Sequence, residues 1–186
     1  MDLLWADLLN SDWRDYRGSG TREDRIGNDA WLAEFLARAG WGAGPLPAKA
    51  GRESLRRLRA RLRRMADDLI AGRAASRGDI TELNRLLAAS PLVPKIEESR
   101  AGLSLVHDAT GSPLSRTMAA IAASFASVLI QGDPKRVKIC ANPDCGWVIY
   151  DESRNRTRLW CDVKECGNLI KVRRFRARRR RKPPSK

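Results

Sequence analysis

The chain has 186 residues, and 42% of them are hydrophobic, which is more than a disordered protein would contain. This length suits one ordinary domain with a small additional module or tail. The formal net charge of +14 indicates a polyanionic partner, either a nucleic acid or an anionic membrane surface.

The excess charge is concentrated near the C-terminus. Residues 135–186 contain 17 basic and 5 acidic side chains, a net charge of +12, which leaves a net charge of only +2 for residues 1–134. Such asymmetry predicts two parts with different tasks. Residues 1–7 lack the basic and apolar regions of a targeting signal, and the most apolar stretch, 118–130, is shorter than the ~20 residues that span a bilayer. We therefore expect a cytoplasmic protein with reduced thiols and no membrane partner.

The first 134 residues are predicted to be mainly helical. Asp29 can cap a short helix that ends at Gly40. Apolar residues then recur at helical spacing from Leu55 to Leu69, with arginines on the opposite, solvated side. A capping box at residues 79–82 opens a further helix.

Two extended segments, 93–97 and 103–107, flank a predicted hairpin loop at 99–102, and Pro94 would confine its strand to a sheet edge. Residues 113–131 form a last helix with one apolar stripe and many alanines. The fold class predicted is mainly α: four or five helices with one small β-hairpin, followed by a small four-cysteine module and a basic C-terminal helix or tail.

All four cysteines lie within 27 residues, in two close pairs separated by a loop: Cys140, Cys145, Cys161 and Cys166. Two short chelating turns of this kind can bring four thiolates around one tetrahedral Zn²⁺. The metal would stabilise a segment with few large apolar side chains. Two disulfides, an iron ion or free thiols are the alternatives. Four thiolates close the coordination sphere, so the predicted zinc is structural and not catalytic.

Basic residues surround the cysteines. Between the pairs, alternating arginines would project from one side of an extended backbone, and no acidic residue follows Cys166. In a C-terminal helix, Leu169, Val172 and Phe175 could dock on the zinc core while the arginines face outward. The predicted nucleic-acid contacts are Arg154, Arg156, Arg158, Lys171, Arg173, Arg174, Arg176, Arg178 and Arg179. A basic tail that only aids solubility is the alternative.

Three segments carry a resemblance to a known family: C-x4-C-G-W from Cys140, D-x-S-R-N-x-x-R-x-W-C from Asp151, and C-G-N from Cys166. Together they resemble the CGNR zinc-finger family. Its members are bacterial proteins in which the finger follows a mostly helical domain, called ABATE, and they are described as putative stress-induced transcription regulators. One departure is plain, because Leu169 stands where the family motif has arginine. The departure leaves all four zinc ligands in place.

The N-terminal part is similar to the ABATE domain in the segments at 8–13 and 83–87. The resemblance implies a sensing or ligand-binding role for this domain. Asn10, Trp13 and Asn84 are candidates to line a pocket; alternatively they are a turn residue, a core aromatic and a helix-surface amide. We expect the helical domain to span residues 1–134, the finger with its basic extension 135–182, and a disordered tail 183–186.

The leading prediction is a zinc-dependent transcription regulator that binds double-stranded DNA through the finger, while the helical domain senses an effector or mediates dimerisation. A homodimer would suit a symmetric site, and the 113–131 helix is a candidate interface. An RNA-binding zinc ribbon and a protein-interaction adaptor with purely structural zinc remain as alternatives. The sequence shows no nucleophile–base pair and no Gly-rich phosphate loop, so we expect no enzymatic activity.

Overall fold

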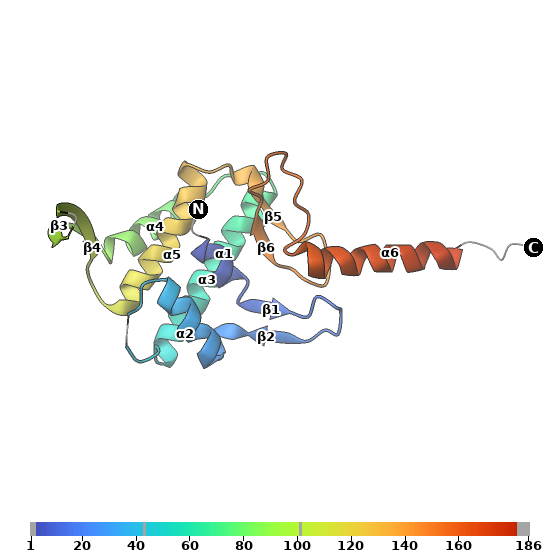
Figure 1. The fold of residues 1–186 in the computed structure, drawn as a ribbon, viewed down its shortest axis with the longest axis horizontal. Helices are drawn as coiled ribbons and strands as arrows, with labels where there is room; N and C mark the ends of the chain where they lie inside the picture. The colour runs from blue at the N-terminus through green and yellow to red at the C-terminus, as the bar shows by residue number, and fades with distance from the viewer. Residues whose placement is uncertain (1–2, 43, 101, 182–186) are drawn as a thin grey trace, which may run out of the picture.

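The computed structural model describes residues 3–42, 44–100 and 102–181. The tail expected at 183–186 and Lys182 lie outside these described residues. The fold is mainly α, as expected (Figure 1). Its helices are α1 (Leu4–Leu9), α2 (Asp29–Arg38), α3 (Lys49–Ile70), α4 (Arg77–Ala88), α5 (Pro113–Ile130) and α6 (Asn168–Arg181). Shorter turns of helix are η1 (Arg25–Gly27), η2 (Pro134–Arg136) and the π-helical η3 (Val163–Gly167).

The strands in the described part of the chain form three antiparallel hairpins, where the sequence predicted one. They pair β1 (Asp12–Arg14) with β2 (Arg22–Asp24), β3 (Leu92–Ser99) with β4 (Gly102–Ala109), and β5 (Val137–Ile139) with β6 (Val148–Tyr150). The β3–β4 hairpin confirms the prediction, with longer strands than expected. The other two hairpins have only three residues a strand, which is too short for a periodic pattern to reveal.

The core forms where the apolar sides of α1, α3, α4 and α5 meet. Leu55, Leu62 and Met65 bury the predicted stripe of α3, and its arginines remain on the outer side. Trp5 of α1 packs edge-on against Phe125 of α5, with ring centroids 5.3 Å apart. This packing fixes the short α1 against the longer helices.

The α5 helix is long and apolar enough, by length and composition alone, to cross a membrane. Its apolar side is instead packed inside the molecule, with Ile121, Phe125 and Val128 fully buried. The apolar stripe of this candidate dimer interface is therefore covered by the chain's own α1, α3 and α4, and whether the rest of the helix forms an interface stays a prediction.

The core continues past residue 134, where the sequence suggested a boundary. Val137, Val148 and Tyr150 of the β5–β6 hairpin belong to the same buried cluster as the helices. The Tyr150 hydroxyl accepts a hydrogen bond from the Asp133 amide at 3.0 Å. The segment that holds the cysteines is thus packed on the helical part, and the division at 134/135 stays a prediction.

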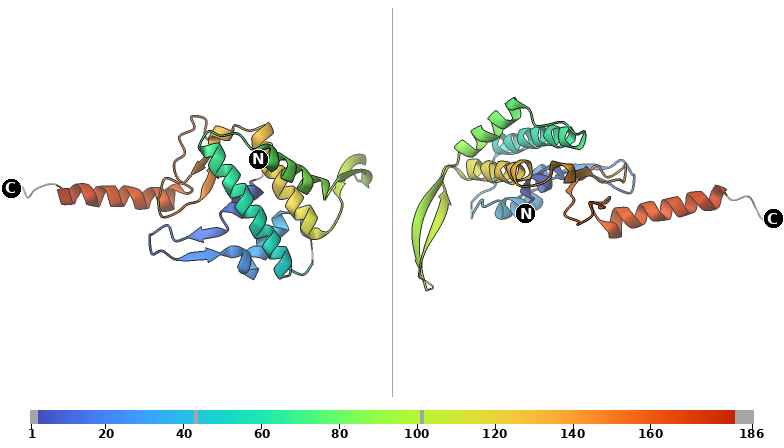
Figure 2. Two further views of the ribbon diagram at one scale, coloured as in Figure 1. Left: turned by 180° about the vertical axis from the view of Figure 1, so that it is seen from behind. Right: turned by 90° about the horizontal axis from the view of Figure 1, so that it is seen from above.

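Two elements extend away from this core in opposite directions. The β3–β4 hairpin, here called the β-arm, leaves one end of the molecule, and α6 leaves the other (Figures 1 and 2). All but one of the described β-arm residues are exposed; Val106 is half-buried.

Candidate metal centre and nucleic-acid interface

The four cysteines come from three local structures. Cys140 and Cys145 lie in the loop between β5 and β6, Cys161 ends the loop after β6, and Cys166 lies in η3. Gly146 permits the first turn, because its φ of +70° favours glycine. The β5–β6 pairing closes the loop that holds Cys140 and Cys145, and a hydrogen bond from the Ala141 amide to the Leu159 carbonyl, at 2.8 Å, brings the second cysteine pair to the first.

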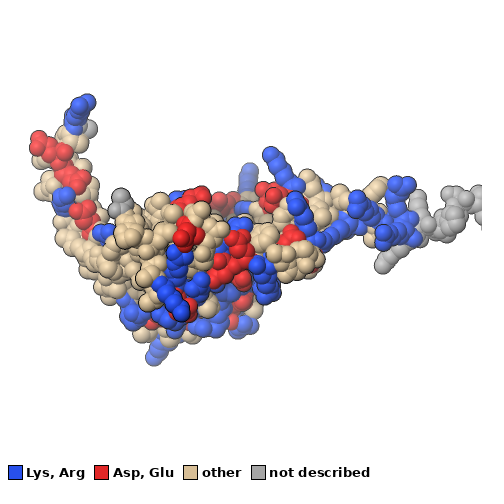
Figure 3. All heavy atoms as spheres, turned by 90° about the horizontal axis from the view of Figure 1, so that it is seen from below, with Lys and Arg blue, Asp and Glu red and all other residues tan. Residues whose placement is uncertain are grey.

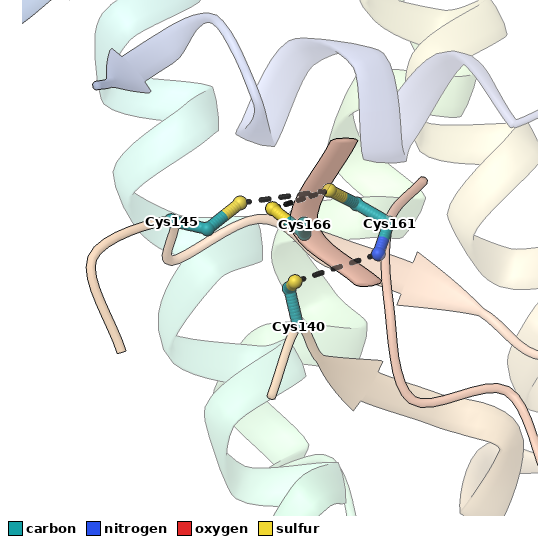
Figure 4. A group of neighbouring side chains, drawn as sticks. All are labelled: Cys140, Cys145, Cys161 and Cys166. Atoms are coloured by element: carbon teal, nitrogen blue, oxygen red, sulfur yellow. Dashed lines mark hydrogen bonds between the residues drawn. The ribbon is translucent and has the colours of Figure 1, made fainter. Parts of the chain in front are cut away.

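The four sulfur atoms converge (Figure 4). All lie within 4.8 Å of one another, and Cys161 Sγ is 3.6 Å from both Cys145 Sγ and Cys166 Sγ. A tetrahedral ion with Zn–S bonds of about 2.3 Å requires sulfur atoms about 3.8 Å apart. All four cysteines are free of disulfides, and three are buried. The arrangement therefore fits one structural Zn²⁺ with four protein ligands.

The protein also provides hydrogen bonds to the sulfur atoms. The Cys161 amide donates to Cys140 Sγ, and the Asn142 side-chain amide donates to Cys166 Sγ, each at 3.4 Å. Asn142 is fully buried and also donates to the Tyr16 carbonyl at 2.8 Å. Such donors orient thiolate ligands and offset their charge. Asn142 was not among the residues predicted for the site, although its place between two ligands is a signal for this role.

The crowded thiols favour different protonation states. Hydrogen bonds from Cys145 and Cys161 lower the pKa of Cys140. The same contacts raise the pKa of Cys145 and of Cys161, because each donates to the thiolate of Cys140. Four thiolates at this separation repel one another, so all four ionise together only around a cation. The site is therefore built for a divalent metal.

Asp151 organises the loop between the cysteine pairs. Its fully buried carboxylate accepts hydrogen bonds from Lys138 Nζ at 2.6 Å, from the Ser153 amide at 2.9 Å and from the Arg158 amide at 3.0 Å. Burial opposes ionisation, but these donors outweigh it and lower the pKa of Asp151. The Asp and Ser of the family-like segment are thus structural in this chain.

The sequence predicted that the arginines of this loop project from one side. This prediction was wrong, because the backbone turns after Ser153. Arg154 is exposed. Arg156 is exposed and pairs with Asp133 at 2.7 Å. Arg158 is half-buried and donates to the Cys161 carbonyl at 2.6 Å, so it supports the metal loop.

The α6 helix begins directly after Cys166, and its first turns fix it to the body. Ile170 is buried and Leu169 is half-buried. Arg173 pairs with Asp144 of the first chelating loop and donates to the Arg17 carbonyl, both at 2.6 Å. The expectation that Val172 and Phe175 dock was wrong: they are 45% and 53% exposed, because α6 leaves the body before a second turn can pack.

Beyond this anchor, α6 presents basic side chains to solvent (Figure 3). Among the described side chains, Arg173 is the one on α6 that forms an ion pair. The Arg179 guanidinium lies 5.8 Å from the ring centre of Phe175. The exposed predicted contacts on this helix are Lys171, Arg174, Arg176, Arg178 and Arg179.

The three candidate ligand residues lie on different elements. The Asn10 side chain is bonded to both backbone groups of Val148, at 2.9 and 2.8 Å. Trp13 is half-buried on β1 beneath the Arg25 guanidinium, and Asn84 is exposed on α4. Asn10 therefore binds β6 of the finger to the helical part.

Helices with a closed four-cysteine site define a mainly helical protein with a zinc finger built into its surface. Residues 136–179 match the model of the CGNR zinc finger. Residues 2–132 match the ABATE model, described as "Putative stress-induced transcription regulator". Because the second match covers more than half of the chain, the protein belongs to this family and is a zinc-binding protein of the regulatory class. No curated protein matches the chain.

Proposed function

We propose that the protein is a zinc-dependent transcription regulator that binds double-stranded DNA, acting in the bacterial cytoplasm. The observation that carries the proposal is α6. This helix of 14 residues contains eight basic side chains and no acidic one, and it starts two residues after a zinc ligand. Its length of about 21 Å and diameter of about 10–12 Å suit the major groove, which is about 12 Å wide.

The charge of α6 itself favours a polyanionic partner. Arg174 and Arg178, and likewise Arg176 and Arg180, stand four residues apart, a spacing at which like charges destabilise a helix. The distal turns also lack an apolar face that packs on the body. Phosphates would neutralise these charges and supply contacts along the helix. Arg154, exposed beside the metal loop, extends the same basic surface.

Zinc dependence follows from how α6 is anchored. Arg173 reaches Asp144, which lies between the ligands Cys140 and Cys145. Loss of the metal would release both ends of this anchor, because the chelating loop and the start of α6 are ordered by the same ion. With four thiolates the zinc has no open position, so we propose no catalytic role.

The helical part offers a candidate effector site. A cleft of about 410 Å³ lies between α3 and α4, with a floor of Leu58, Leu86 and Met118. Its rim contains four arginines, Arg57, Arg61, Arg64 and Arg85, and one acidic residue, Glu82, which pairs with Arg85 at 2.8 Å. Arg64 is bonded to Asp79 at 2.7 Å, whereas Arg57 is bonded, within the described part of the chain, to the neutral Ser54 hydroxyl at 2.9 Å. This charge suits a carboxylate or phosphate group on a small effector, which a thermal-shift screen of such anions would test.

The deciding experiment is a fluorescence-anisotropy titration with duplex DNA, single-stranded DNA and hairpin RNA at several salt concentrations, with and without zinc. We expect a zinc-dependent preference for duplex DNA. The double variant Arg174→Ala/Arg178→Ala should reduce the slope of log K against log salt by about 2, one for each phosphate contact.

The matched control is Arg22→Ala/Arg77→Ala, which removes the same charge from exposed positions on β2 and α4. It should leave the salt slope unchanged. Equal binding to all three nucleic acids, or equal binding after chelation, would refute the proposal. A preference for hairpin RNA would favour the RNA-binding alternative, and a flat salt dependence would favour a protein-interaction adaptor.

A further inference from the structure

The β-arm lacks the support that such a hairpin needs. Its strands pair along their whole length, from Leu92 with Ala109 to Ser99 with Gly102. No described residue of the β-arm is buried. A two-stranded hairpin alone in water is marginally stable at best, so an ordered arm of this length requires a covering surface.

The two faces of the β-arm differ sharply. Residues paired across an antiparallel ladder share a face, so the register assigns every side chain to one face. One face is mainly polar, although Val93 and Val106 belong to it, and there Lys95 pairs with Glu97 at 2.9 Å and with Asp108 at 3.7 Å. The other face is apolar and consists chiefly of Leu92, Pro94, Ile96, Leu103, Leu105 and Ala109.

The apolar face is open to solvent. Ile96 and Leu105, paired at its centre, are 69% and 64% exposed, and Leu103 near the tip is 75% exposed. A contiguous apolar surface of this kind on a folded protein marks an interaction site. We propose that a second copy of this chain covers it, so that two β-arms pack apolar face to apolar face in a symmetric dimer.

Charge placement on the apolar face favours a second copy as the partner. The face has one acidic residue, Glu98, which lies two residues beyond Ile96 toward the tip of the arm. It has one histidine, His107, which lies two residues beyond Leu105 toward the body of the protein. A two-fold axis that crosses the arm at the Ile96–Leu105 pair turns the second arm end for end. Glu98 of each arm then lies at the end of the interface where the other arm presents His107, a hydrogen-bond donor for a carboxylate. The surface is thus complementary to itself, as a closed two-fold interface requires.

The position of the arm is compatible with this assembly. The β-arm and α6 lie at opposite ends of the molecule (Figures 1 and 2). A dimer formed through the arms leaves both α6 helices uncovered, so the dimer needs no DNA and does not compete with it. On α5, the alternative interface, the apolar stripe is already packed within the chain.

Sedimentation equilibrium of the zinc-loaded full chain, without DNA, tests the proposal. Leu105→Glu removes a central apolar contact from each arm and should raise the dimer dissociation constant about 100-fold or more. The matched control is Val106→Glu, one residue away on the polar face and opposite Lys95, which should leave dimerisation unchanged. Both positions lie outside the core, so zinc content and far-UV circular dichroism should match the wild type.

A mixing experiment identifies the partner and the orientation. The axis places Leu105 of one arm against Leu105 of the other, so Leu105→Glu and Leu105→Lys should each be monomeric and should form a heterodimer when mixed. A monomeric wild type at every concentration, equal effects of the Leu105→Glu and Val106→Glu substitutions, or no rescue on mixing would each overturn the proposal. None of these results depends on DNA binding.

Discussion

Replacing Asn10 by alanine should loosen the finger from the helical part. The Asn10 side-chain amide donates to the Val148 carbonyl at 2.9 Å and accepts from the Val148 amide at 2.8 Å. It therefore bonds to β6 as an additional strand would. Val148 is only 1% exposed, so water has little access to these backbone groups when the amide is removed.

The size of the effect follows from the two unmet backbone groups. A buried donor or acceptor without a partner costs about 1–3 kcal/mol, so the loss of both bonds in Asn10→Ala should reduce the free energy of unfolding by roughly 2–6 kcal/mol. For a chain of this length, each kcal/mol corresponds to about 2–4 °C in Tm. We expect the Tm to fall by at least about 4 °C and at most about 24 °C. Because β6 begins three residues after Cys145, zinc should also be extracted faster by a chelator.

Chemical denaturation, calorimetry and a colorimetric zinc-release assay measure these three quantities. The control is Asn84→Ala, which removes the same amide from an exposed position on α4 and should change stability by less than about 0.5 kcal/mol. If Asn10→Ala unfolds with the same free energy as Asn84→Ala, the two hydrogen bonds do not hold the finger, and the reasoning fails.

Three further predictions concern Asp151, the metal and α6. Asp151→Asn should destabilise the protein by about 2 kcal/mol relative to the exposed control Glu34→Gln, because it removes the carboxylate that pairs with Lys138 and leaves that ammonium with carbonyl acceptors alone. Since folding lowers the pKa of Asp151, this contribution is complete above the ordinary carboxyl pKa and lost as the pH falls through the lower folded value, so the stabilities of wild type and variant should begin to converge below about pH 4 and approach each other further as the pH falls. Chelation should lower the Tm of the whole chain by roughly 10 °C or more and alter the near-UV signal of Trp5, because β5 and β6 share its core; a change confined to the finger would contradict this. Duplex DNA should increase the far-UV helical signal by at most the 14 residues of α6, and an unchanged signal would show that this helix is already stable alone.

The sequence was sufficient for the parts that depend on regular patterns. The apolar stripe of α3 predicted its buried side, because a 3.6-residue period leaves few alternatives. The cysteine spacing predicted the metal site for a similar reason, since four thiolates near one ion restrict the fold of the segment that carries them.

The contacts between the finger and the helices could not be read from the sequence. Asn10 and Val148 are 138 residues apart, and nothing in either local pattern indicates that they meet. Two of the arginines predicted to contact nucleic acid instead form contacts within the chain, which the local sequence also does not reveal. Composition places Arg158 and Arg173 among the nucleic-acid contacts, whereas the fold engages one with the Cys161 carbonyl and the other with Asp144. A basic side chain is available to a ligand only when it is not already bonded to an acceptor within the protein.

These contacts suggest how the helical part could control the finger. One short N-terminal segment reaches the finger at three places: Asn10 bonds Val148, the Tyr16 carbonyl accepts from Asn142, and the Arg17 carbonyl accepts from Arg173. The first holds β6, the second a metal-site residue and the third α6. A shift of this segment relative to α3 would therefore reorient the strand, the metal loop and the basic helix together. Under the proposed function, an effector or a second copy that alters α1, α3 or α5 should change DNA affinity through this segment, because the finger shares a core with those helices.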